Sequence, residues 1–134
     1  MVTLFPQLLD WGFFGPTLLR VAAGVFLLSL AWRHLHNDRA AALAALTSRL
    51  GTLASFGVWY MGLLELLAGA SLLVGFLTQL GALAAIVVSL QMLYLRRYAP
   101  EHFSHHNAVY LFLIAIALSL LVLGPGALAF DLPL

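Results

Sequence analysis

The sequence predicts an all-α integral membrane protein, built as one bundle of four transmembrane helices with a short interfacial helix between the first two. Composition is the first observation: 63% of the 134 residues are hydrophobic, 8% are charged, and the mean hydropathy is +1.04. The second is that four apolar segments approach the roughly 20 residues that an α-helix needs to cross a bilayer. Because no repeat or long linker divides the chain, we expect a single domain over residues 1–134.

Residues typical of helix starts and stops lie at the ends of the predicted spans. Pro16 suits a first helical turn, because its fixed φ is helical and its missing N–H is not needed there. A short turn, GFLTQLG, joins the second and third spans, and Gly124-Pro125-Gly126 stops the fourth. The spans are expected at about residues 14–33, 53–75, 79–96 and 106–123.

The connection between the first two spans is predicted to form an amphipathic helix. Its leucines recur at spacings of three and four residues, with polar side chains elsewhere, at Leu43, Leu46, Leu50 and Leu53. A short helix of this pattern is typical of the membrane interface.

The arginines predict the orientation. Cytoplasmic loops carry the Lys/Arg excess, and five of the six arginines fall in the two connections on one side, at Arg33, Arg39, Arg49, Arg96 and Arg97. Both termini should therefore lie outside the cytoplasm.

Charge and cysteine content exclude several function classes. The formal net charge of +1 leaves no basic surface for nucleic acid. The absence of cysteine excludes thiol and disulfide exchange and iron–sulfur ligation by this chain alone. The lipid bilayer is the partner that the composition requires, and homo-oligomer formation is left open.

Glu65 is the first candidate functional residue. It is the only Asp, Glu, Lys, Arg or His in the second span, where a carboxylate costs roughly 2.5 kcal/mol or more unless it is protonated, paired or facing a polar cavity. Gly62, Ala68 and Gly69 share its helical face, so we expect Glu65 to point into the bundle. It would be protonated at pH 7 and handle protons, or be satisfied structurally by Ser89, Gln91 or a backbone carbonyl.

Arg20 and Asp131 form the second candidate. Arg20 lies within the first span and needs a partner, and its side chain leans away from Glu65. Asp131 follows the Gly-Pro-Gly stop on the same side of the membrane. We expect an Arg20–Asp131 ion pair that anchors the tail over the bundle, with a purely architectural role as the alternative.

Aromatic and histidine side chains give weaker candidates. Trp59 is expected as an interface anchor, or as part of a lipid or quinone cleft together with Tyr60. The H-x-x-H-H segment, His102, His105 and His106, is interpreted as a polar helix start, with a metal site as the alternative.

Several segments resemble the DoxX family of small four-helix bacterial membrane proteins. They are LLRVAAGVFLLSLAW, GLLELLAGASLLVGFLTQLGALAAIVV and LGPGALAFDLPL. The most specific parts are an E-x-x-x-G motif, a G-x-x-T turn and a Gly-Pro-Gly tail ending in an aspartate, at Glu65, Gly69, Gly75, Thr78, Gly124, Pro125, Gly126 and Asp131. After the first span, where many relatives carry a Gly and a Lys, this chain has Ala31-Trp32-Arg33-His34.

The resemblance implies a place in a bacterial inner-membrane redox system. Relatives include a membrane subunit of thiosulfate:quinone oxidoreductase, so the expected partners are redox proteins and quinone, with no intrinsic cofactor. The residues leave two alternatives open: a proton-coupled transporter that relies on Glu65, and a non-catalytic scaffold or assembly subunit. The strong arginine bias favours a single orientation, which counts against a transporter of the antiparallel type.

Overall fold

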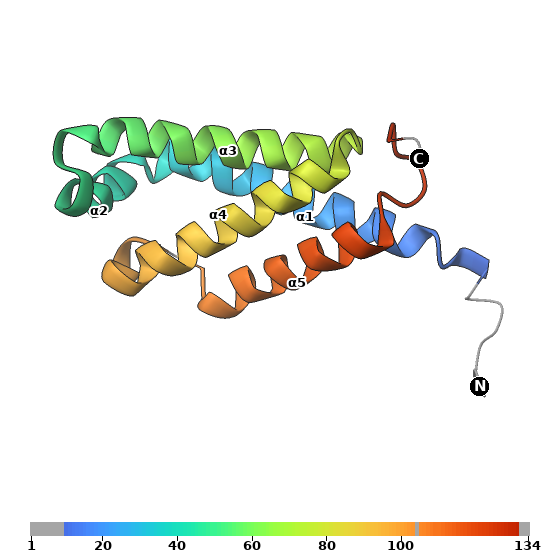
Figure 1. Ribbon diagram of the computed structural model, residues 1–134. Helices are drawn as coiled ribbons and strands as arrows, with labels where there is room; N and C mark the ends of the chain where they lie inside the picture. Colours follow the sequence, from blue (N-terminus) through green and yellow to red (C-terminus); the bar gives the residue numbers. More distant parts are fainter. Residues whose placement is uncertain (1–9, 104, 132–134) are drawn as a thin grey trace.

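The computed structural model describes residues 10–103 and 105–131, except for the side chain of His102. This part of the chain contains helices and no strand, which confirms the all-α prediction. Its α-helices, labelled in Figure 1, are α1 (Phe14–Trp32), α2 (Arg39–Leu50), α3 (Ala54–Val74), α4 (Thr78–Tyr98) and α5 (Asn107–Leu123). Single turns of other helix types are η2 (Arg33–Asn37, a π-helix), η3 (Gly51–Leu53) and η4 (Pro100–His102).

Within the described residues, three helical segments are long and apolar enough to cross a membrane. They are Phe14–Asn37, Arg39–Val74 and Thr78–Tyr98, in which neighbouring helical turns are counted together. The helix α5 is also apolar but shorter, at 17 residues. The chain thus has the composition and helix lengths of a multi-pass membrane protein.

Glycines bring α1 and α3 into close antiparallel contact. A Cβ atom added at Gly24 would lie 2.9 Å from the backbone nitrogen of Leu73 and 3.0 Å from the carbonyl oxygen of Gly69. Small residues allow two helices to approach this closely. In lipid the hydrophobic effect does not draw helices together, so close packing of this kind holds them instead. In Figure 1, α3 runs alongside α1, while α4 and α5 lie together on the other side of the bundle.

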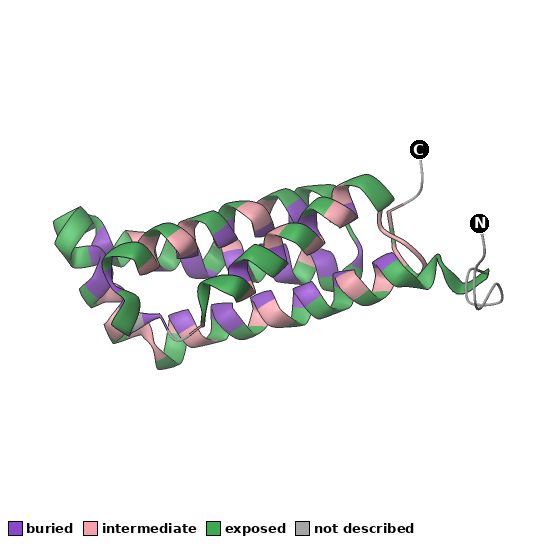
Figure 2. Cartoon of the chain, turned by 90° about the horizontal axis from the view of Figure 1, so that it is seen from below, coloured by how far each residue is buried: buried purple, intermediate pink, exposed green. Residues whose placement is uncertain are grey.

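The buried residues line the interior of the bundle. Figure 2 shows buried residues on the faces that the helices turn toward each other, and exposed residues on the outer faces. Many outward side chains are large and apolar, such as Leu18, Phe112 and Val122. Exposed apolar surface on this scale indicates a lipid environment. The buried polar side chains of the described residues are Arg20, His34, Glu65, Thr78 and Ser89.

Candidate functional site

A buried pair of ionisable side chains lies between the end of the first helical segment and α3. The Nδ1 atom of His34 is 3.0 Å from one Glu65 carboxyl oxygen and 2.9 Å from the other. The two residues are only 6% and 0% exposed. Glu65 therefore points into the bundle, as the sequence indicates, but its partner is a histidine.

The π-helical turn η2 places His34. It widens the helix after Trp32, and the backbone N–H of Asp38 donates to the carbonyl of Arg33, 2.7 Å away, across five residues. Single π-turns within helices are frequent at functional sites. Gly62 lets this turn approach α3, because a Cβ there would lie 2.5 Å from Leu35.

Aromatic rings surround the pair. The ring of Phe103 meets that of His34 at 6.2 Å between centroids and 67° between planes. Tyr110 is 1% exposed and close enough to Glu65 for the two groups to interact electrostatically. The pair is thus enclosed by apolar and aromatic groups, where an unshared charge is costly.

The sequence suggested Ser89 and Gln91 as hydrogen-bond partners that would hold Glu65 in a purely structural role, but neither binds it. Ser89 donates its hydroxyl to the carbonyl of Ala85 at 2.7 Å. Gln91 has a buried side-chain oxygen with no hydrogen-bond partner, and it makes no bond with Glu65. Both residues lie on α4, whereas the partner comes from the end of α1.

Sequence reasoning did not include His34 among the candidate site residues. The sequence spacing could have indicated that His34 is buried. The buried side chains of the first helix recur three and four residues apart, and His34 continues this series. The series is Ala23, Leu27, Leu30, Ala31 and His34. A histidine on the buried face of a span is a natural partner for a carboxyl group.

At the opposite end of the bundle, Arg20 binds the tail that follows α5. It donates from Nη1 to the carbonyl of Pro125 at 2.9 Å and from Nη2 to that of Leu128 at 3.1 Å. Its residue is 2% exposed. Thr17 adds a third bond to the tail, donating its hydroxyl to the Ala127 carbonyl at 2.7 Å. Arg20 thus anchors the tail, as expected, through backbone carbonyls.

The predicted ion pair between Arg20 and Asp131 is wrong. Asp131 instead accepts hydrogen bonds from the backbone N–H groups of Leu77, at 2.7 Å, and Thr78, at 2.5 Å. The physical reason is that the first N–H groups of a helix have no intrahelical partner and attract a carboxylate. The backbone of Asp131 also donates to the Gly75 carbonyl at 3.0 Å, so the tail closes over the α3–α4 turn.

The hydrogen bonds at Asp131 affect its protonation. Burial acts to raise the pKa of this carboxyl group, but the hydrogen bonds from Thr78 and Leu77, with the nearby charge of Arg20, hold it below its ordinary value. Asp131 is therefore ionised at neutral pH, and its contacts with α4 are present there.

Trp59 does not join the buried pair. It is 53% exposed on the outer face of α3, with the Arg39 guanidinium 5.2 Å from its ring centroid. This position fits the interface anchor of the sequence prediction. Its neighbour Tyr60 does line a cavity of about 190 Å³ among α2, α3 and α4.

The histidines before α5 lie in different surroundings. His105 lies between the rings of Phe26 and Tyr110, whereas His106 is exposed. The side chain of His102 lies outside the described part of the chain. Among the described side chains, no three His, Cys, Asp or Glu come together as metal ligands.

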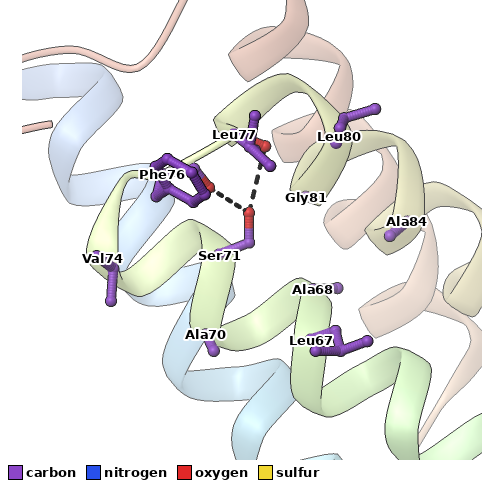
Figure 3. A pocket seen from close by; sticks show the side chains of 10 residues that line it. All are labelled: Leu67, Ala68, Ala70, Ser71, Val74, Phe76, Leu77, Leu80, Gly81 and Ala84. Atoms are coloured by element: carbon purple, nitrogen blue, oxygen red, sulfur yellow. Dashed lines mark hydrogen bonds between the residues drawn. The ribbon is translucent and has the colours of Figure 1, made fainter. Parts of the chain in front are cut away.

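A second, larger cavity opens between α3 and α4. It has a volume of about 520 Å³, and almost all of its lining is apolar. Figure 3 shows Ser71 donating its hydroxyl to the carbonyls of Phe76 and Leu77, at 2.6 and 3.2 Å. The lining residues are Leu67, Ala68, Ala70, Ser71, Val74, Phe76, Leu77, Leu80, Gly81 and Ala84. Ala68 follows Glu65 by one helical turn on α3, and the cavity extends from there toward the α3–α4 turn.

Comparison with known proteins identifies the family of the chain. The family model described as DoxX matches residues 15–96, well over half of the chain, and the matched segment contains Arg20, His34 and Glu65. No curated protein and no solved structure matches. The apolar helices and the family match agree. The chain is a membrane protein that belongs to the DoxX family.

Proposed function

We propose that this DoxX-family chain is an integral subunit of a redox system in the bacterial inner membrane, and that its His34–Glu65 pair exchanges protons with a bound quinone. The observation that carries the proposal is the pair itself, with Nδ1 of His34 within 3.0 Å of both Glu65 oxygens in an enclosed site. Ionisable groups at this depth are rare and costly, and they mark proton and substrate pathways.

The chemistry of the pair suits proton exchange. With one shared proton the pair is neutral overall, either as imidazole and carboxylic acid or as imidazolium and carboxylate. Gain or loss of one further proton leaves a single charge on the pair. A partner that takes up or releases protons nearby would shift this balance.

The cavity between α3 and α4 supports a lipophilic partner. Its lining suits an isoprenoid or acyl chain rather than a polar molecule, because the hydroxyl of Ser71 is already bonded to carbonyls. Reduction of a quinone to a quinol takes up two electrons and two protons. In this proposal a separate redox protein supplies the electrons, and the His34–Glu65 pair supplies or receives protons.

In the proposed membrane arrangement, α5 is a fourth span and α2 lies in the interface. The buried face of α2 packs on the start of α3, through Ala42 and Leu46 against Ala54 and Val58. The guanidinium of Arg49 on α2 lies 3.7 Å from the ring centroid of Tyr98 at the end of α4. The arginine-rich connections thus gather at one end of the bundle, which the positive-inside rule assigns to the cytoplasm.

Cysteine labelling tests this arrangement. We expect Gln79→Cys to react with a membrane-impermeant thiol reagent in intact cells, and Ser48→Cys to react only after the cells are opened. Both side chains are exposed, and the chain has no cysteine of its own to give background labelling. Labelling of Ser48→Cys in intact cells would reverse the proposed orientation.

Infrared titration tests the proton-exchange proposal. In lipid nanodiscs, we expect a protonated carboxyl band that changes with pH, is absent in Glu65→Gln, and is retained in Glu101→Gln, where an exposed carboxyl group is replaced. Linkage requires quinone affinity to change over the same pH range, because a ligand coupled to a proton alters the affinity for that proton equally.

The glutamine variant separates function from structure. Glu65→Gln keeps the size of the side chain and a hydrogen bond to His34, so the fold should survive. We expect quinone binding to lose its pH dependence in this variant. Quinone binding that is identical in both proteins at every pH would contradict the proposal and assign Glu65 a scaffolding role.

A further inference from the structure

The helix α2 carries an exposed arginine beside the smaller of the two cavities. We propose that this end of the bundle binds an anionic phospholipid, with the headgroup phosphate at Arg49 and Arg97 and part of an acyl chain in the cavity among α2, α3 and α4. The inference uses the membrane arrangement proposed above, in which α2 lies in the interface. It does not depend on quinone or on proton exchange.

The ring of Tyr98 holds the side chain of Arg49 in place. The guanidinium carbon of Arg49 lies 3.7 Å from the centroid of this ring, within the range of a cation–π contact. Stacking covers one face of the planar guanidinium and leaves the N–H groups in its plane, where they match the oxygens of a phosphate. Because the ring already restrains the side chain, less conformational freedom is lost when an anion binds.

Arg97 adds a second positive charge at the same place. It precedes Tyr98 in the last turn of α4, it is exposed, and both arginines interact electrostatically with Tyr98. Among the described residues, the ion pairs lie elsewhere and involve neither Arg49 nor Arg97. A partner with net negative charge therefore fits this surface better than a zwitterionic one, whose ammonium group would add a further positive charge.

An apolar cavity lies next to these arginines. Leu46 and Leu50, on the helix that carries Arg49, line this cavity of about 190 Å³. Tyr94 lines it from α4, and its ring meets that of Tyr98 at 5.0 Å between centroids and 63° between planes. The two tyrosine rings thus connect the charged surface to the cavity.

A positive surface beside an apolar cavity fits an amphiphile. Gln91 and Tyr94, which line the cavity, lie seven and four positions before Tyr98 and so nearer the middle of the span. A phospholipid places its phosphate at the interface and its chains below, in the same order. Basic pockets between transmembrane helices on the cytoplasmic side bind anionic headgroups, and the positive-inside rule assigns this end to that side.

Native mass spectrometry in neutral detergent micelles tests the inference, because it counts the lipids bound to each chain. The probes are dioleoyl phosphatidylglycerol, which is anionic, and dioleoyl phosphatidylcholine, which is zwitterionic and has the same chains. We expect the wild type to bind the anionic lipid more tightly. Arg49→Gln should weaken that binding about fivefold, the factor that one arginine near an anionic lipid contributes, and the double variant with Arg97→Gln about 25-fold.

Arg39→Gln is the matched control. Arg39 is at the other end of α2, with its guanidinium 5.2 Å from the ring centroid of Trp59, so this variant should bind the anionic lipid as the wild type does. Arg49 and Arg97 are exposed, and replacing them should leave the fold intact.

Three results would overturn the inference. They are equal affinity of the wild type for the two lipids, equal weakening in Arg39→Gln, and displacement of the lipid by glycerol 3-phosphate at the same concentration, which would show that the acyl chain contributes nothing. Each of them leaves proton exchange by the His34–Glu65 pair intact, since infrared titration measures that separately. Micelles have no inside or outside, so a reversed orientation in cells would not change the lipid result.

Discussion

Replacing His34 with leucine is expected to lower the free energy of unfolding by about 3–5 kcal/mol, the range found when one partner of a buried ion pair is removed. The cost arises because Glu65, which is fully buried, loses its hydrogen-bond partner at 2.9 Å and must remain protonated or stay charged without compensation. Glu65→Leu should have a comparable effect, since it leaves the His34 imidazole in an apolar site.

The double variant His34→Leu with Glu65→Leu should recover much of this loss. Two apolar side chains in contact leave no buried polar group without a partner, and buried ion pairs replaced in this way are often neutral or more stable. Unfolding in mixed detergent micelles measures all four proteins in one double-mutant cycle. His36→Leu, at an exposed position, is the control and should change stability little.

Additive effects of the two single changes would show that His34 and Glu65 do not interact. A recovered double variant that still folds but no longer exchanges protons would show that the pair is kept for its chemistry. The cycle therefore measures the contact on which the proposed function depends.

Replacing Arg20 with leucine is expected to cost about 3 kcal/mol or more, because two hydrogen bonds from a charged donor are lost and each contributes about 1.5–3 kcal/mol. The accepting carbonyls belong to Pro125 and Leu128, so the variant should release the segment after α5. Limited proteolysis of this segment, together with detergent unfolding, measures the effect. Arg33→Leu is the matched control, since the Arg33–Asp38 pair is about one-third exposed and such pairs contribute about 0–1 kcal/mol.

Arg20 and Asp131 should be coupled even though they form no ion pair, because both hold the same segment of chain. Once Arg20→Leu has released it, Asp131→Asn should cost little more, so the double change is less than additive. Acid should act in the same direction. The pKa of Asp131 lies below its ordinary value, so its contribution is present at neutral pH and is lost as the pH falls through that lowered pKa. Full additivity, or no effect of acid on the tail, would contradict this account.

The helices and their membrane character could be predicted from the sequence by itself. Hydropathy and turn residues depend on neighbours within a few positions, so the α-helices begin and end within a few residues of the predicted limits, as at Gly75 and Gly124. The inward direction of Glu65 was also predictable, because its face carries Gly62, Ala68 and Gly69 and its charge cannot face lipid. The family resemblance, carried by motifs in order along the chain, is confirmed over residues 15–96.

Only the tertiary structure decided which groups bind one another. His34 and Glu65 are 31 positions apart, and they meet because a π-turn rotates the end of the first helix and Gly62 lets that turn approach α3. Asp131 binds Leu77, 54 positions away, because the α3–α4 turn presents free N–H groups where the tail returns. Local periodicity shows which face of a helix is buried. The rotation and depth of one helix against another then select the partner, and they depend on packing along the whole length of the bundle.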